Sequence, residues 1–219
     1  MPHMAYGRDF HLGPLRGLTT AGHRRVLLRL RNGFGVYRLV DRSTALVHGM
    51  LADGWELHVP LFHTEDTVIV PRAWGTPSGL HLYNLSDVFA TDLAPLAADP
   101  VAALRDMVRA VTADDGVERA VYLPHVDAYP EWFHGHQEGI GAPLREAAET
   151  LLADDSGPRL VIATTFAAAG PDWAQFDRVL VVGDDEVFDE RSGPDPELAR
   201  ARRLRAERER DERRRLFGL

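Results

Sequence analysis

The chain has 219 residues, with 25 basic against 33 acidic side chains and a formal net charge of −8 at pH 7. It contains no cysteine, and every basic residue is arginine. The missing cysteines exclude disulfides, thiolate nucleophiles and iron–sulfur clusters. The missing lysines exclude a Schiff base to pyridoxal phosphate and the lysine of a P-loop nucleotide site.

The length suits one domain or two small ones. No apolar run approaches the roughly 18 residues that a membrane helix needs. The first residues also show neither the basic start nor the apolar core of a secretory signal. We therefore expect a cytoplasmic protein without membrane association.

Residues 24–84 are predicted to be rich in strands. Short runs of β-forming residues at 25–30, 35–40, 55–61, 67–70 and 80–85 are separated by turn residues such as Asn32 and Gly33. One helix is expected between them, capped by Ser43 or Thr44 and stopped by Gly54. These features predict a small antiparallel or mixed sheet with a helix on one face, over residues 1–95.

From residue 96 to 190 the pattern changes to alternating helix and strand. Asp99 and Pro100 are a typical cap and first-turn proline, and apolar residues then recur at helical spacing. A strand at 117–123, a helix at 143–153 and strands at 159–164 and 178–182 follow. This order predicts a parallel α/β portion, so the chain as a whole is expected to be α/β or α+β.

The segment RLVIATTFAAAGPDWAQFDRVLVVG, residues 159–183, resembles a stretch in the second lobe of superfamily 2 helicases, which couples nucleotide and nucleic acid. The arginine that follows the alanines in that family is missing here, and no Walker loop precedes the segment. The resemblance implies a RecA-like or Rossmann-like strand arrangement for residues 96–190, and no functional residue is carried over from it.

Ligands of parallel α/β sheets usually bind beyond the carboxyl ends of the strands. If strands 117–123, 159–164 and 178–182 are neighbours, histidines and carboxylates there can share one crevice and bind zinc or manganese. The expected ligands are His125, Asp127, His134, His136, Glu138, Asp184 and Asp185. A metal held there can activate water, as in a phosphoesterase or nuclease.

Two other interpretations apply to the same loop. Its histidines and acids are ordinary polar loop residues, and their spacing matches no metal motif. Gly139 and Gly141 can offer backbone N–H groups to an anion before the helix at 143–153, or can simply give the chain freedom to enter that helix. No Gly-x-Ser-x-Gly pattern is present, so a serine hydrolase is not expected.

The last segment, residues 195–219, carries nine arginines against six acids. It predicts a long charged helix in which Leu198, Ala201 and Leu204 can pack on the body. Nucleic-acid binding through these arginines is disfavoured, because acids are interleaved and the rest of the chain is strongly acidic. The last residues resemble a docking peptide, in which Arg213, Arg214 and Arg215 precede Leu216 and Phe217.

The sequence therefore predicts two alternative functions. The first is a non-catalytic assembly protein that binds a protein partner through residues 195–219 and the Leu216–Phe217 end. The second is a metal-dependent hydrolase that uses the 125–138 loop together with Asp184 or Asp185. The residues leave open whether the protein is an enzyme.

Overall fold

The structure is a computed structural model. It describes residues 24–30, 36–62, 66–86, 95–124, 126, 140–153, 160–165, 176–182 and 187–189, and the single residues 200, 204, 207 and 210. The helices are α2 (Val36–Ala52), α3 (Asp66–Trp74), α4 (Pro100–Val111) and α5 (Gly141–Ala153). The strands are β1 (Arg25–Leu30), β2 (Glu56–Leu61), β3 (Leu80–Asn84), β4 (Arg119–Leu123), β5 (Leu160–Thr165), β6 (Arg178–Val182) and β7 (Val187–Asp189).

The seven strands form one sheet in the order β3-β2-β4-β5-β1-β6-β7. All neighbouring pairs from β3 to β6 are parallel, and β7 pairs antiparallel with β6. The sequence-based expectation of an antiparallel or mixed N-terminal sheet is therefore wrong. β2 and β3 pair in parallel, and β1 lies between β5 and β6, so strands from residues 1–95 and 96–190 share the same sheet.

Two of the expected strands are helices. Residues 35–40 were expected to be extended, but α2 begins at Val36 and runs to Ala52. Val40 is buried with Val47 and Met50 in one apolar cluster, a helical spacing that continues across the polar Ser43. Ser43 accordingly lies inside the helix, where its hydroxyl pairs with Tyr122 Oη at 3.3 Å instead of capping a helix end.

The second of these is the β-branched run at 67–70, which lies in the nine-residue helix α3. Residues of this run pack into the core on the same side as Trp74, which is 1% exposed. The Trp74 indole N–H donates to the carbonyl of Val40 at 3.2 Å, which ties α3 to α2. Tertiary packing thus outweighs the intrinsic strand preference of this short run.

The remaining elements were largely predicted. Strands at 25–30, 55–61, 80–85, 117–123, 159–164 and 178–182 correspond to β1, β2, β3, β4, β5 and β6 within one or two residues. Gly54, expected to stop a helix, follows α2 with a φ of 88°, which a residue with a side chain rarely adopts. Asp99 caps α4 by accepting a hydrogen bond from Ala102 N at 3.0 Å. The sequence did not indicate β7.

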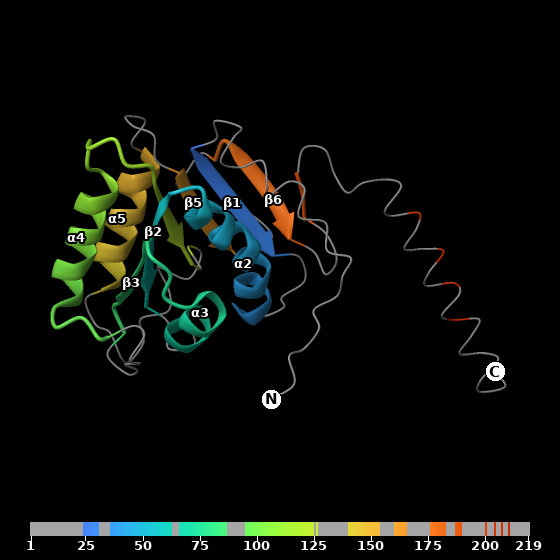
Figure 1. The fold of residues 1–219 in the computed structure, drawn as a ribbon, viewed down its shortest axis with the longest axis horizontal. Coiled ribbons are helices and arrows are strands. Elements are labelled where there is room, and N and C mark those ends of the chain that lie inside the picture. The colour runs from blue at the N-terminus through green and yellow to red at the C-terminus, as the bar shows by residue number, and fades with distance from the viewer. Residues whose placement is uncertain are drawn as a thin grey trace.

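The sheet is covered on both faces. One core cluster joins α2 and α3 to residues such as Leu57 and Tyr122, and the other joins α4 and α5 to residues such as Val121 and Val161. Figure 1 shows α4 and α5 side by side against the sheet, away from α2 and α3. Alternate residues of each strand therefore belong to different layers, and a polar side chain on β2 or β4 is buried under one particular pair of helices.

Of the C-terminal segment, the structure describes only Arg200, Leu204, Glu207 and Arg210, so the long charged helix remains a prediction. Leu204 is 49% exposed, and the expectation that it packs on the body is wrong. Among the described helices, none combines the length and the apolar character required to cross a membrane.

The Asp99 cap should contribute measurably to stability, because α4 covers the part of the sheet formed by β2, β3 and β4. Asp99→Ala should lower the free energy of unfolding by about 1 kcal/mol in urea denaturation. Asp114→Ala, a change at an exposed residue in the turn after α4, is the matched control and should change it by less than about 0.5 kcal/mol. Equal losses in the two variants would contradict a capping role for Asp99.

Candidate functional site

The carboxyl edge of the sheet has part of the expected arrangement. β4 and β5 are neighbours, whereas β6 is separated from β5 by β1. Thr164 and Thr165 are the last residues of β5 and are fully buried.

The residues predicted to bind a metal lie outside the described part of the chain; they are His125, Asp127, His134, His136, Glu138, Asp184 and Asp185. The expected docking residues lie outside it too; they are Arg213, Arg214, Arg215, Leu216 and Phe217. The metal site of the 125–138 loop therefore stays a prediction.

A different polar cluster lies at the amino edge of the sheet. Glu56 and His58 are two residues apart on β2, so their side chains leave the same face. His81 is the register partner of His58 on β3, and Arg119 is the register partner of Glu56 on β4. Parallel pairing thus brings four polar side chains from three adjacent strands onto the face that α4 covers.

Arg119 fixes the carboxylate of Glu56. Its Nε donates to Glu56 Oε2 at 2.8 Å, and its two terminal nitrogens donate to the two oxygens of Asp115 at 2.6 and 2.8 Å. The pKa of Asp115 is lowered to about 2, mainly because its carboxylate accepts hydrogen bonds from Arg119. Arg119 is 8% exposed, and its pKa is raised, chiefly by its hydrogen bonds to Asp115. The ion pair between Arg119 and Asp115 is therefore formed at neutral pH.

His58 lies deeper than its neighbours and is 2% exposed. Its Nδ1 is 2.8 Å from Tyr83 Oη, and its ring stacks on His81 with centroids 4.6 Å apart. Burial, followed by the proximity of His81, lowers the pKa of His58 to about 4. Burial also raises the pKa of Tyr83 to about 12. Both rings are neutral at pH 7, so the imidazole can offer a lone pair.

The other nitrogen of that imidazole, His58 Nε2, is buried without a hydrogen-bond partner in the part of the chain that the structure describes. Its nearest ionic group is Glu56 Oε2, 3.9 Å away. Glu56, His58 and His81 each offer a ligand atom, and these atoms lie within 4.8 Å of one another. Two imidazoles and one carboxylate are a set of donors that divalent transition metals bind.

Sequence reasoning missed this cluster although its signal was present. Both strands were predicted, and Glu56-x-His58 places two donors on one strand face. What the sequence could not supply was the register between β2 and β3, which sets His81 directly beside His58.

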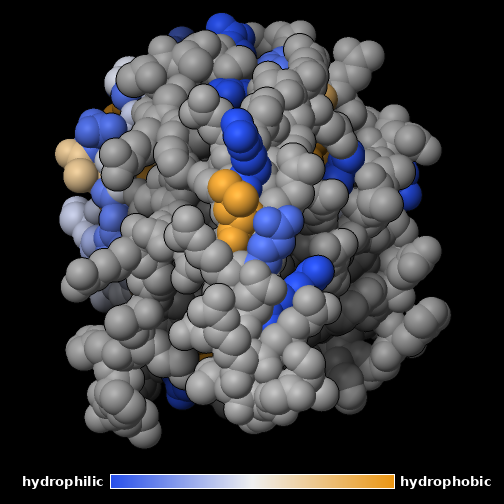
Figure 2. All heavy atoms as spheres, turned by 90° about the vertical axis from the view of Figure 1, so that its right-hand side faces the viewer, coloured by the Kyte–Doolittle hydropathy of each residue, from blue (hydrophilic) through white to orange (hydrophobic). Residues whose placement is uncertain are grey.

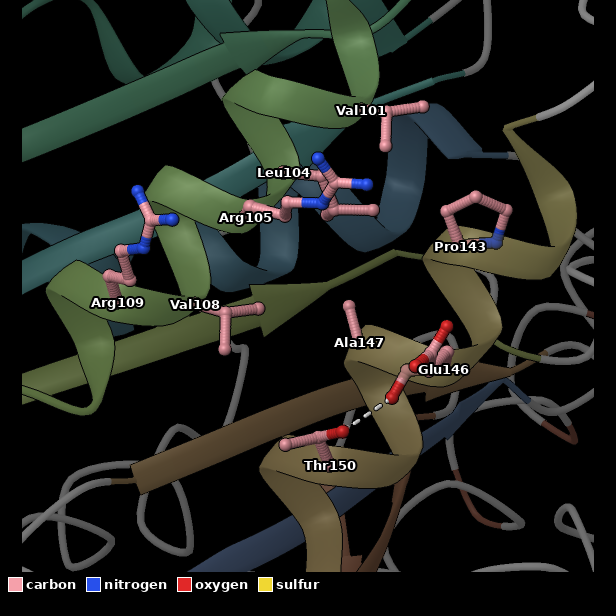
Figure 3. A pocket seen from close by; sticks show the side chains of 9 residues that line it. All are labelled: Val101, Leu104, Arg105, Val108, Arg109, Pro143, Glu146, Ala147 and Thr150. Carbon is pink, nitrogen blue, oxygen red and sulfur yellow. Dashed lines mark hydrogen bonds between the residues drawn. The ribbon is translucent and has the colours of Figure 1, made fainter.

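A groove of about 340 Å³ lies on the outer surface, between α4 and α5. Figure 3 shows Val101, Arg105 and Val108 of α4 and Pro143 and Ala147 of α5 lining it. No residue of the Glu56–His58–His81 cluster contributes to this lining. The two features are therefore separate, and the groove does not provide a substrate cavity for that cluster.

No protein-family model matches this chain, and the search of curated proteins found no match either.

The depressed pKa of His58 should make stability depend on pH. In the unfolded chain this histidine takes up a proton near pH 6.5, whereas in the folded protein it does so only near pH 4. The unfolded state therefore binds more protons between these values, and the free energy of unfolding should fall as the pH is lowered from 6.5 to 4. The contribution is on the order of 3 kcal/mol at most.

Urea denaturation between pH 4.5 and 7, with EDTA present, tests this expectation. His58→Asn, which keeps a polar atom near the Nδ1 position, should flatten the pH dependence. His48→Asn, at an exposed position on α2, serves as control and should retain it. An unchanged slope in His58→Asn would show that other groups cause the dependence.

Proposed function

We propose that the protein is a non-catalytic assembly protein that binds a protein partner through residues 195–219 and the Leu216–Phe217 end. The observation that supports this proposal is the exposure of Leu204. A large apolar side chain in a segment dominated by arginine and glutamate keeps about half of its surface in water. A partner that covers this surface would remove the apolar area from water.

The composition of the segment supports the same proposal. Beyond Leu204 the next large apolar residues are Leu216 and Phe217, separated from it by a charged stretch. Burying a leucine or a phenylalanine gains about 1.5–3 kcal/mol each. Two or three such anchors are typical of peptides that dock in a partner's groove, and the three arginines before them can increase the association rate with an acidic partner.

Figure 2 views the molecule from the right-hand side of Figure 1, the side on which the described C-terminal residues lie. A small hydrophobic patch on this face is bordered by hydrophilic atoms. Burying one exposed leucine gains only about 1.5–3 kcal/mol, so the proposal relies on several anchors acting together.

A metal-dependent hydrolase is the second candidate function. The neighbouring positions of β4 and β5 favour it, because the loop that carries His125 and Asp127 begins where these two strands end side by side. Its ligands would be the residues of the 125–138 loop with Asp184 or Asp185. A zinc titration of a His134→Asn, His136→Asn variant tests it, since that variant should lose metal if the loop binds it.

For the assembly function, partner capture by the tagged full-length chain should depend on the C-terminal anchors. Leu216→Ala with Phe217→Ala should weaken partner binding at least about 100-fold, because each side chain contributes more than the 1.4 kcal/mol that equals a factor of ten. Leu204→Ser should weaken it less. The melting temperature should stay within about 1 °C in all these variants, since none of the changed groups is expected to pack on the body.

Leu96→Ser is the matched control, because Leu96 is the other large hydrophobic residue that the structure shows exposed, at 44%. It should leave the captured proteins and their affinities unchanged. Partner binding that survives the double change at Leu216 and Phe217 would place the interface elsewhere. A loss that is as large in Leu96→Ser would mean that the capture is non-specific.

A further inference from the structure

The buried His58 Nε2 faces a carboxylate and a second imidazole but has no hydrogen-bond partner among the described residues. Leaving a buried polar nitrogen unpaired is costly, and in native proteins such an atom usually has a partner, which can be a bound water or an ion. We propose that Glu56, His58 and His81 bind one Zn²⁺ ion at the amino edge of β2 and β3. This inference is independent of the assembly function proposed above.

The donor set suits zinc. Zn²⁺ binds imidazole nitrogen at about 2.0–2.1 Å and carboxylate oxygen at about 2.0–2.2 Å, and three protein ligands with one water are a common arrangement. Tetrahedral ligands at these distances lie about 3.3 Å apart. The distance of 3.9 Å between His58 Nε2 and Glu56 Oε2 therefore needs to shorten by only about half an ångström.

The third ligand can adjust to the ion. His81 is exposed and lies on the edge strand β3, so its ring can turn about the side-chain bonds and leave its stack on His58. The two rings lie nearly parallel, with an interplanar angle of 16°, so this turn is needed to direct both in-plane lone pairs at one ion. The position left for water is on this exposed side.

Two outer groups orient the ligands. A zinc-bound Nε2 requires the proton of His58 on Nδ1, and Tyr83 Oη lies 2.8 Å away to accept it. Arg119 Nε donates to Glu56 Oε2 at 2.8 Å and orients the carboxylate, and this oxygen keeps a second lone pair for the ion. Histidine ligands of zinc commonly donate their second N–H to such an outer partner, and loss of that partner weakens metal binding about 10–100-fold.

The charges are compatible with a cation. Glu56 and Asp115 carry two negative charges against the single positive charge of Arg119. The cluster is thus net negative before the ion binds, and Asp115 keeps Arg119 neutralised when Glu56 turns toward zinc. The ion would connect the edge strand β3 to β2 in addition to their backbone hydrogen bonds.

The experiment is a titration of the EDTA-stripped full-length chain with ZnCl₂ by isothermal calorimetry, with metal content measured after dialysis. We expect one Zn²⁺ per chain and a higher melting temperature when zinc is present, because the ion binds only the folded site. Glu56→Gln, His58→Asn and His81→Asn should each weaken binding by more than about 100-fold, and Tyr83→Phe by about 10-fold. His48→Asn, an exposed histidine outside the cluster, should bind as the wild type does.

The variants also separate this site from the 125–138 loop. Zinc binding that persists in His58→Asn and disappears in His134→Asn, His136→Asn would overturn the proposal and support the loop. Absence of stoichiometric binding at 100 µM ZnCl₂, about a hundred times a micromolar Kd, would overturn it as well. If His58→Asn does not fold, His81→Asn at the exposed ligand gives the same test without a buried change.

Discussion

The parallel pairing of β2 with β3 on one side and β4 on the other is the constraint on which the amino edge of this sheet depends. Each pair has a fixed register, in which His58 faces His81 and Glu56 faces Arg119. A slip of β2 by one residue would send Glu56 and His58 to the opposite face, away from His81 and Arg119. Leu57 N donates to the carbonyl of Gly79 at 2.7 Å at the start of β3. Gly79 has a φ of 85°, and a Cβ there would lie 3.0 Å from the carbonyl oxygen of Trp55.

The same register explains how a polar cluster is compatible with a packed core. Leu57 and Val59, which alternate with the polar residues of β2, pack under α2 and α3. Glu56 and His58 point to the α4 side, at the end of the sheet where Arg119 and Asp115 complete the ion pairs. Burial keeps His58 neutral. Tyr83 forms a hydrogen bond with only one of its two ring nitrogens, Nδ1. The second nitrogen is the feature for which a metal ion provides a partner.

Local patterns predicted most of the strands and the capped helix α4, because alternation and capping depend on neighbouring residues. They failed where packing between distant segments decides. The run at 35–40 predicts a strand, yet Val40 joins Val47 and Met50 on one helical stripe. The run at 67–70 is β-branched, yet it is helical beside Trp74. The sequence likewise gave no indication that β1 lies between β5 and β6.

The candidate site shows the same division. The residues placed at the carboxyl edge followed from a general rule about parallel sheets and lie outside the described part of the chain. The cluster at the amino edge required knowledge of two strand registers, which no local pattern contains. His81 follows His58 by 23 positions, and only the pairing of β2 with β3 makes them neighbours.

The most direct test of this account is a crystal structure of the full-length chain grown with one equivalent of Zn²⁺, with anomalous difference maps from data collected on both sides of the zinc absorption edge. The account predicts one zinc peak. Its ligand atoms are His58 Nε2, a nitrogen of His81 and a carboxylate oxygen of Glu56, each about 2.0–2.2 Å from the ion. A peak at other residues, or no peak beside an unchanged Glu56–Arg119 ion pair, would contradict it.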